Sequence, residues 1–181
     1  MKTYIALLRG INVSGQKKIK MANLKLMLMK IGLTDVVTYI QSGNMVFKSA
    51  GKKSHILEEK IKKGVADSFG FDVTVVVKTK MGLEEILQKN PFTKQEDLEA
   101  KRVYYALLKE VPEKDAIGNL KPEDYPSELF LITKECVYLN CLNGAGKAKL
   151  TNNVLERKLG VSATTRNHRT MAKLLELAEE N

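Results

Sequence analysis

Short apolar runs alternate with segments of helical apolar spacing along the whole chain. In the first half, four short runs are typical of buried strands, and in two segments apolar side chains recur every three or four residues, as in a helix. The expected strands are Tyr4 to Leu8, Val36 to Ile40, Met45 to Phe47 and Val73 to Val77, and the expected helices are Met21 to Ile31 and Leu57 to Phe69. This βαββαβ order is that of a ferredoxin-like unit.

The second half repeats this order and adds one helix. The expected strands are Val103 to Leu108, Leu129 to Ile132, Cys136 to Leu142 and Val161 to Thr164; the expected helical segments are Glu113 to Leu120, Leu150 to Leu159 and Met171 to Ala178. We therefore predict an α+β fold of two ferredoxin-like βαββαβ-type subdomains in tandem, with an extra C-terminal helix. The predicted bounds are residues 1–80 and 102–181, joined by a connecting segment over 81–101.

Positive charge is concentrated in two blocks of the sequence. The formal net charge is +9, yet the first acidic residue is Asp35, and seven Lys and Arg residues precede it. Residues 147–173 hold seven more against the single acid Glu156. This distribution favours an anionic partner, such as nucleic acid, a phosphorylated metabolite or an acidic membrane surface. The alternative is an ordinary Lys-rich surface.

Several classes of protein are disfavoured by the sequence. No apolar run approaches the ~20 residues that a membrane span requires, so we expect no membrane segment. The N-terminus shows no signal-peptide pattern, and the expected location is the cytoplasm.

The cysteines and histidines indicate neither a disulfide nor a metal centre. Cys136 and Cys141 lie in one expected strand, roughly 16 Å apart, which is too far for them to bridge each other. We expect two buried thiols. With only His55 and His168 available, a His/Cys metal cluster is hard to build, and we predict no cofactor.

A first polar cluster follows from the topology of the first subdomain. Its first two strands run parallel, with the third antiparallel between them, so the end of the first strand and the expected hairpin turn share one edge. This places Arg9 and Asn12 near Ser42 and Asn44. Arg donors and accessible backbone suit an anion, and we predict that these four residues bind the ligand. The alternative is a strand exit with a structural Arg, next to a simple hairpin turn.

A second cluster is predicted for the second subdomain. The loop from Asn143 to Lys147 and the segment from Thr165 to Arg169 follow strands that end at the same edge of the sheet. The predicted ligand-binding residues are Lys147, Lys149, Arg166, Asn167 and His168. Ala148 stands where a Walker phosphate-binding loop requires Ser or Thr. The alternative for Thr165 to Arg169 is a helix N-terminus capped by Thr or Asn.

Five segments together resemble a widespread family of conserved bacterial proteins of unknown function. They are Ala6 to Val13, Thr38 to Asn44, Asn90 to Phe92, Lys149 to Arg157 and Ala163 to Asn167. The resemblance spans almost the whole chain and implies a pair of α+β subdomains, the first ferredoxin-like, with no established activity. Two positions depart from the family pattern: His168 replaces a common Trp, and Ala148 replaces a common Ser.

Three functions fit these observations. The leading prediction is a protein that binds an anionic ligand, either nucleotide or RNA, through the clustered Arg, Lys and Asn residues. The second is an enzyme acting on a phosphorylated or carboxylated small molecule, with Arg9 and Arg166 holding the anion and His168 or Ser42 assisting proton transfer. The third is a protein-interaction module. The sequence indicates neither the oligomeric state nor whether the two clusters form one site.

Overall fold

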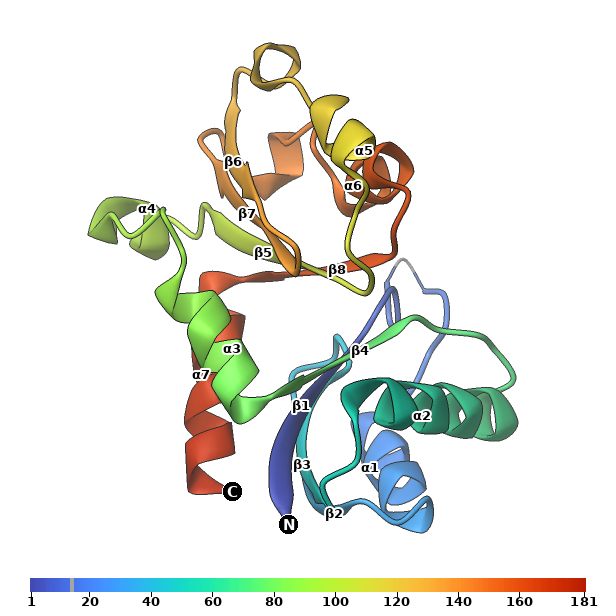
Figure 1. The fold of residues 1–181 in the computed structure, drawn as a ribbon. Helices are drawn as coiled ribbons and strands as arrows, with labels where there is room; N and C mark the ends of the chain where they lie inside the picture. The colour runs from blue at the N-terminus through green and yellow to red at the C-terminus, as the bar shows by residue number, and fades with distance from the viewer. Residues whose placement is uncertain (14) are drawn as a thin grey trace. The chain divides into compact units, whose positions relative to one another are not determined.

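The computed structural model describes residues 1–13 and 15–181, which form two compact units (Figure 1). Unit 1 comprises Met1–Glu85 and Lys173–Asn181, and unit 2 comprises Ile86–Ala172. The subdomain bounds predicted from the sequence, 1–80 and 102–181, stay a prediction.

Unit 1 contains the first βαββαβ arrangement. Its elements are β1 (Lys2–Leu8), α1 (Met21–Lys30), β2 (Thr34–Tyr39), β3 (Asn44–Ser49), α2 (Ser54–Phe69), β4 (Val75–Thr79) and most of α3 (Lys80–Gln88). The sheet order is β2-β3-β1-β4, and β3 is antiparallel to both β1 and β2. This is the ferredoxin-like topology that the sequence predicted.

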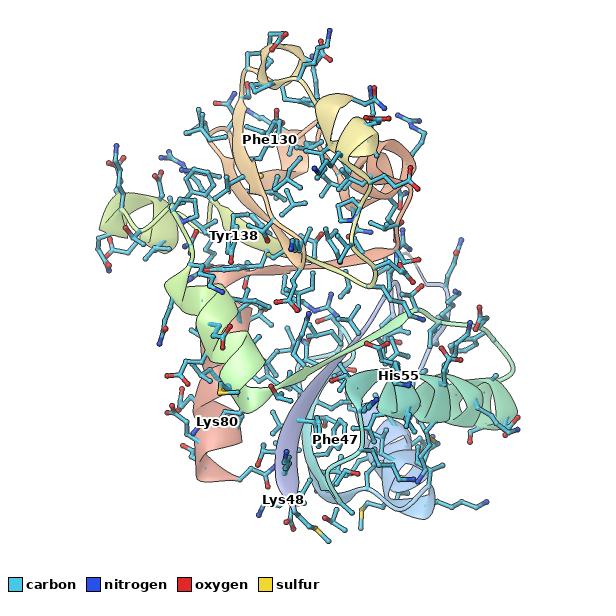
Figure 2. The ribbon with its side chains drawn as sticks, in the orientation of Figure 1. Phe47, Lys48, His55, Lys80, Phe130 and Tyr138 are labelled. Atoms are coloured by element: carbon cyan, nitrogen blue, oxygen red, sulfur yellow. The ribbon has the colours of Figure 1, made fainter. Side chains whose placement is uncertain are left out.

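The core of unit 1 lies between the sheet and helices α1 and α2. Alternate residues of β1, namely Tyr4, Ala6 and Leu8, face this core, as the period of two in a strand requires. The ring of Tyr4 stacks on Phe47 of β3 at a centroid distance of 5.9 Å, and Figure 2 shows Phe47 inside the unit. The apolar face of each helix therefore packs on one face of the sheet.

The end of the C-terminal helix α7 (His168–Glu180) belongs to unit 1. Asn181, the last residue, donates from Nδ2 to the backbone oxygen of Asp35 on β2 at 2.8 Å. Lys80 and Glu179 form an ion pair at 4.0 Å. These contacts attach the C-terminal end of the chain to the edge strand β2 and to the start of α3.

Unit 2 contains the second arrangement. Its elements are the end of α3, α4 (Gln95–Glu99), β5 (Val103–Leu108), α5 (Lys114–Gly118), η1 (Pro122–Asp124), β6 (Glu128–Ile132), β7 (Cys136–Cys141), η2 (Ala145–Lys147), α6 (Asn152–Leu159), β8 (Ala163–Asn167) and the start of α7. The sheet order is β6-β7-β5-β8, which repeats that of unit 1. The predicted α+β fold with tandem ferredoxin-like units is confirmed.

Each unit contains the same two backbone hydrogen bonds at equivalent positions, although the two sequences show no repeat. The four bonds are Leu8 N to Gly43 O at 2.8 Å, Arg9 N to Thr74 O at 2.9 Å, Leu108 N to Glu135 O at 2.9 Å and Lys109 N to Ser162 O at 2.9 Å. In each unit, the end of the first strand is thus bonded to the turn before the third strand and to the residue before the fourth. Arg9 of unit 1 therefore corresponds to Lys109 of unit 2.

The boundary between β8 and α7 differs from the expectation. The strand extends to Asn167 and the helix begins at His168, whereas the sequence predicted a strand ending at Thr164 and a helix from Met171. The reason is local: Oδ1 of Asn167 accepts a hydrogen bond from the backbone N–H of Thr170 at 2.8 Å. Asn167 therefore acts as the N-cap, which is the alternative considered for this segment.

The two cysteines are buried free thiols, as predicted. Cys141 belongs to the core between the sheet of unit 2 and α6. Burial, assisted by the nearby charge of Glu128, raises the pKa of Cys141 to about 11. Its thiol therefore stays protonated at neutral pH and is a poor nucleophile. Among the described residues, no helix is long and apolar enough to cross a bilayer.

Candidate anion-binding site

Asn12 joins the loop after β1 to the turn between β2 and β3. Its Nδ2 donates to the backbone oxygens of Ile19 at 2.9 Å and Gln41 at 2.7 Å, and its Oδ1 accepts from the N–H of Ile19 at 2.8 Å. Its backbone is left-handed, with φ of 54°, a conformation that Asn tolerates better than most residues. Asn12 therefore lies beside the turn before β3, and its amide is engaged in holding the loop.

The turn between β2 and β3 has an unusual backbone. Ile40 has a φ of 49° although its side chain is β-branched and half-exposed. Such strain costs of order 1–3 kcal/mol and is concentrated at functional sites. The side chain of Asn44 is fully buried and donates to Tyr39 O at 3.1 Å and Ser42 Oγ at 3.0 Å. Asn44 thus holds the turn from inside the unit.

A hollow of about 510 Å³ opens beside this turn, at the N-terminus of α1. It is lined by Asn12, Lys18, Ile19, Lys20, Asn23, Gln41 and Phe69. Lys20 occupies the N-cap position without a capping side-chain hydrogen bond, and the first turn of α1 contains no acidic residue. The first N–H groups of the helix and its positive dipole end are therefore available to an anion.

The lysines of the hollow carry uncompensated charge. Lys18 and Lys20 are exposed, and neither forms an ion pair with an acidic side chain in the described part of the chain. Lys17, next to them, donates from Nζ to the backbone oxygen of Asp72 at 2.6 Å. Lys17, Lys18 and Lys20 thus all lie just before α1, which gives this region a positive potential.

The sequence predicted only part of this site. Of the four residues assigned to the first cluster, Asn12 lines the hollow, whereas Arg9, Ser42 and Asn44 are not among its lining residues. Arg9 is half-buried, and its backbone N–H donates to the backbone oxygen of Thr74. Lys18, Lys20 and Phe69 were not singled out. The run of lysines just before an expected helix was the signal that could have identified the first two.

The second predicted cluster is distributed over the sheet of unit 2. Lys147 lies in η2, and the N–H of Lys149 donates to Oε1 of the buried Glu128 on β6 at 2.7 Å. Arg166 lies on β8. Since β6 and β8 are the two outer strands, three strand spacings, about 14 Å, separate them. The loop that contains Lys147 and Lys149 is therefore attached to the outer strand β6, whereas Arg166 belongs to the opposite outer strand, β8.

Arg166 and Asn167 are engaged in the local structure. Arg166 donates from one terminal nitrogen to Thr164 Oγ1 at 3.0 Å and to the backbone oxygen of Thr165 at 2.9 Å. Burial lowers the pKa of Arg166 to about 10, so the guanidinium is still charged at neutral pH. Asn167 is the helix cap described above. Their predicted role in ligand binding stays a prediction.

His168 pairs with a buried tyrosine. Its Nδ1 lies 2.8 Å from the hydroxyl of Tyr105, and the two rings stack at 5.9 Å. Tyr105 is fully buried, and burial raises the pKa of its hydroxyl, which therefore stays protonated. Burial also lowers the pKa of His168 below its ordinary value of 6.5. A neutral imidazole can accept the tyrosine proton at Nδ1, so the neutral form fits this environment.

Acidification should therefore weaken unit 2 through His168. Because the unfolded chain takes up the proton at a higher pH than the folded chain, the free energy of unfolding should decrease as pH falls below 6.5. Urea unfolding at several pH values checks this. The His168→Phe variant should lose this part of the pH dependence, whereas replacing the exposed His55 with Gln should retain it. An unchanged pH dependence in His168→Phe would contradict the assignment.

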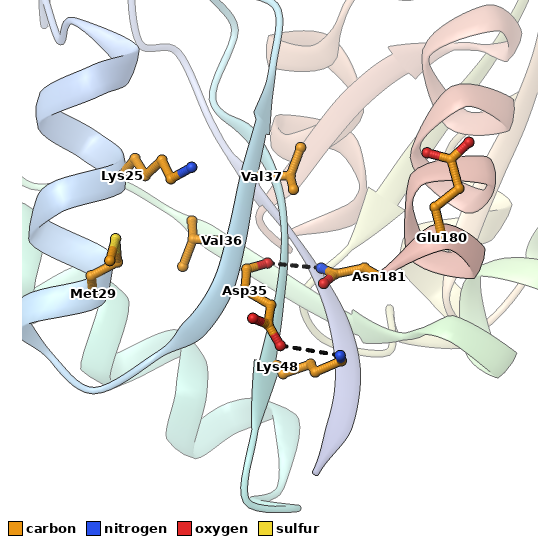
Figure 3. A pocket seen from close by; sticks show the side chains of 8 residues that line it. All are labelled: Lys25, Met29, Asp35, Val36, Val37, Lys48, Glu180 and Asn181. Carbon is orange, nitrogen blue, oxygen red and sulfur yellow. Dashed lines mark hydrogen bonds and ion pairs between the residues drawn. The ribbon is translucent and has the colours of Figure 1, made fainter.

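A second hollow in unit 1, of about 520 Å³, has a different character (Figure 3). It is lined by Lys25, Met29, Asp35, Val36, Val37, Lys48, Glu180 and Asn181. Lys48 forms an ion pair with Asp35 at 3.1 Å, and Asn181 binds the backbone of Asp35. Its charges are of both signs, and this pair is already formed, so it is less suited to an anion than the hollow at α1.

The described residues contain no cluster of side chains suited to a metal ion. No group of three or more His, Cys, Asp or Glu side chains within residues 1–13 and 15–181 is arranged to hold a metal ion. The lining of the hollow at α1 offers N–H donors, ammonium groups and carboxamides.

Comparison with known proteins places the chain in a family. A family described as "Protein of unknown function (DUF1697)" matches residues 1–138. The chain belongs to the DUF1697 family. The DUF1697 match contains the whole hollow at α1 but ends before Lys147, Lys149 and Arg166. The family match thus covers Met1–Glu85 of unit 1 and the first part of unit 2.

The fold of this DUF1697 protein is similar to that of a solved bacterial protein. The conserved bacterial protein SP0830 from Streptococcus pneumoniae aligns with a TM-score of 0.77 and 25% sequence identity, covering 98% of each chain. No curated protein matches the sequence. The tandem two-unit architecture is therefore shared with a known bacterial protein over nearly its full length.

Proposed function

We propose that this protein binds a phosphate-bearing ligand, a nucleotide or RNA, in the hollow at the N-terminus of α1. The observation that carries the proposal is the hollow itself, in which Lys18 and Lys20 have no acidic partner among residues 1–13 and 15–181 and lie beside a helix start without a side-chain cap. A helix N-terminus offers N–H donors and the positive end of a dipole, and lysines add charge. Phosphate groups are commonly bound through both.

Unit 2 provides an internal comparison that supports this assignment. Its helix equivalent to α1 is α5, which has only five residues and carries Asp115 in its first turn. The position equivalent to Arg9 is Lys109, which Glu110 follows, whereas Gly10 follows Arg9. The same fold thus appears twice, and in unit 2 acidic residues offset the charge. A positive surface is therefore not a necessary consequence of the topology.

The proposal is tested by binding a labelled single-stranded RNA over a salt series. The double variant Lys18→Ala/Lys20→Ala should weaken binding about tenfold or more at low salt and reduce the salt slope by about 1.4, since each lost phosphate contact to a single strand lowers the slope by about 0.7. The matched control is Lys114→Ala/Lys121→Ala, which removes two exposed lysines around α5. The control should keep the slope of the unmodified protein.

Free nucleotides added as competitors distinguish the two proposed ligands. Displacement of the RNA by a mononucleotide indicates a small-molecule site, whereas RNA binding that nucleotides do not compete away indicates contacts along a polymer. Equal weakening by both double variants would show that only the net charge of the chain attracts the RNA. That result, or no binding at all, would overturn the proposal.

A further inference from the structure

The hollow at α1 contains more than a phosphate needs. Ile19 and Phe69 form an apolar part of its wall, and Asn23 and Gln41 contribute carboxamide groups. Phosphate is bound by N–H donors and positive charge, and it gains nothing from an apolar wall. The hollow is therefore built for a ligand with a second, less polar portion. Its volume of about 510 Å³ lies within the range of small-molecule sites.

The aromatic part of the wall is held in place. Phe69 ends α2, is half-buried, and stacks on Phe71 with ring centroids 6.4 Å apart and an interplanar angle of 27°. Both phenylalanines pack against the core of unit 1. A ring fixed in this way loses little conformational entropy when a planar group packs on it. Bases bind to aromatic side chains by such stacking.

Two carboxamides in the hollow are available to a ligand. The side chains of Asn23 and Gln41 are exposed and make no hydrogen bond within the described residues. The Asn12 amide, in contrast, is engaged with Ile19 and Gln41. The hydrogen bond from Asn12 holds the backbone oxygen of Gln41, and Gln41 directly follows Ile40, whose backbone is strained. A carboxamide both donates and accepts, which is the pairing that base edges require.

We infer that the hollow recognises the base of a nucleotide as well as its phosphate. The base packs on the ring of Phe69, the side chains of Gln41 and Asn23 bind its polar edge, and Lys18 and Lys20 lie toward the phosphate. This inference rests on the proposed function and adds recognition of the base to the binding of the phosphate. Ligands with the same charge and no base should therefore bind less tightly.

The test is competition against labelled single-stranded RNA by unlabelled RNA and by linear polyphosphate of equal charge. RNA should compete about tenfold more strongly than polyphosphate, because base stacking adds to the phosphate contacts. Gln41→Ala and Phe69→Leu should each weaken RNA binding several-fold and leave polyphosphate binding unchanged. Gln95→Ala, an exposed glutamine of α4, is the matched control. Thermal unfolding establishes that Phe69→Leu is folded, and the exposed Gln41 is tested independently.

The possible outcomes separate the two proposals. Equal competition by RNA and polyphosphate, with Gln41→Ala and Phe69→Leu both unchanged, would overturn base recognition and leave phosphate binding in place. Failure of both ligands to bind would overturn the proposed function together with this inference.

Discussion

Replacing Gly43 with alanine should destabilise unit 1 by about 2 to 5 kcal/mol. Gly43 has a φ of 71°, and a Cβ atom there would lie 2.7 Å from Ile11 Cδ1 and 2.8 Å from Leu8 Cβ. The left-handed backbone costs an L-residue about 1–2 kcal/mol, and overpacking a buried site typically costs a further 1–3 kcal/mol. Both neighbours are buried, and Leu8 is bonded to Gly43 through its backbone, so neither moves easily.

Urea denaturation of Gly43→Ala and Gly10→Ala measures this effect. Gly10 has nearly the same φ, 69°, but no heavy atom within 4 Å of its Cβ position. The Gly10 variant should therefore show only the backbone cost, about 1–2 kcal/mol. Equal losses in the two variants would show that the close approach of Ile11 and Leu8 does not constrain the turn.

Replacing Asn12 with alanine should cost about 3 kcal/mol. The change removes three hydrogen bonds to the backbone of Ile19 and Gln41 and places alanine at a φ of 54°. Because Asn12 joins the loop before α1 to the turn after β2, the loss should also disorder the hollow. Thermal unfolding and RNA binding should both be impaired, and the melting temperature should fall by several degrees.

The variants Asn12→Gly and Asn12→Asp separate the cost of the lost hydrogen bonds from the cost of the left-handed backbone. Glycine removes the amide but accepts the backbone conformation, so it should be less destabilising than alanine. Aspartate retains the acceptor for the N–H of Ile19 and loses both donor bonds. If alanine and glycine proved equally stable, the left-handed backbone would contribute nothing. If all three variants matched the unmodified protein, Asn12 would not be structural.

The arrangement of the first cluster could be predicted because it depends only on strand direction. Once β1 and β2 are parallel with β3 between them, the end of β1 must lie beside the turn before β3, as Leu8 and Gly43 do. To predict the second cluster, one would have to know the path of the loop that contains Lys147 and Lys149. The bond between Lys149 and Glu128, 21 residues apart, attaches that loop to β6, and no periodicity in the sequence reveals such a bond.

The sequence alone determined the order of strands and helices and the concentration of basic residues before Asp35, because apolar periodicity and charge are local properties of the chain. Only the tertiary structure decided which polar side chains are available. It engages Asn12 with Gln41, 29 residues away, buries Asn44, makes Asn167 a helix cap, and places Phe69 beside Lys18 and Lys20. The physical reason is that a polar side chain is either satisfied within the protein or available to a ligand, and distant backbone groups settle which.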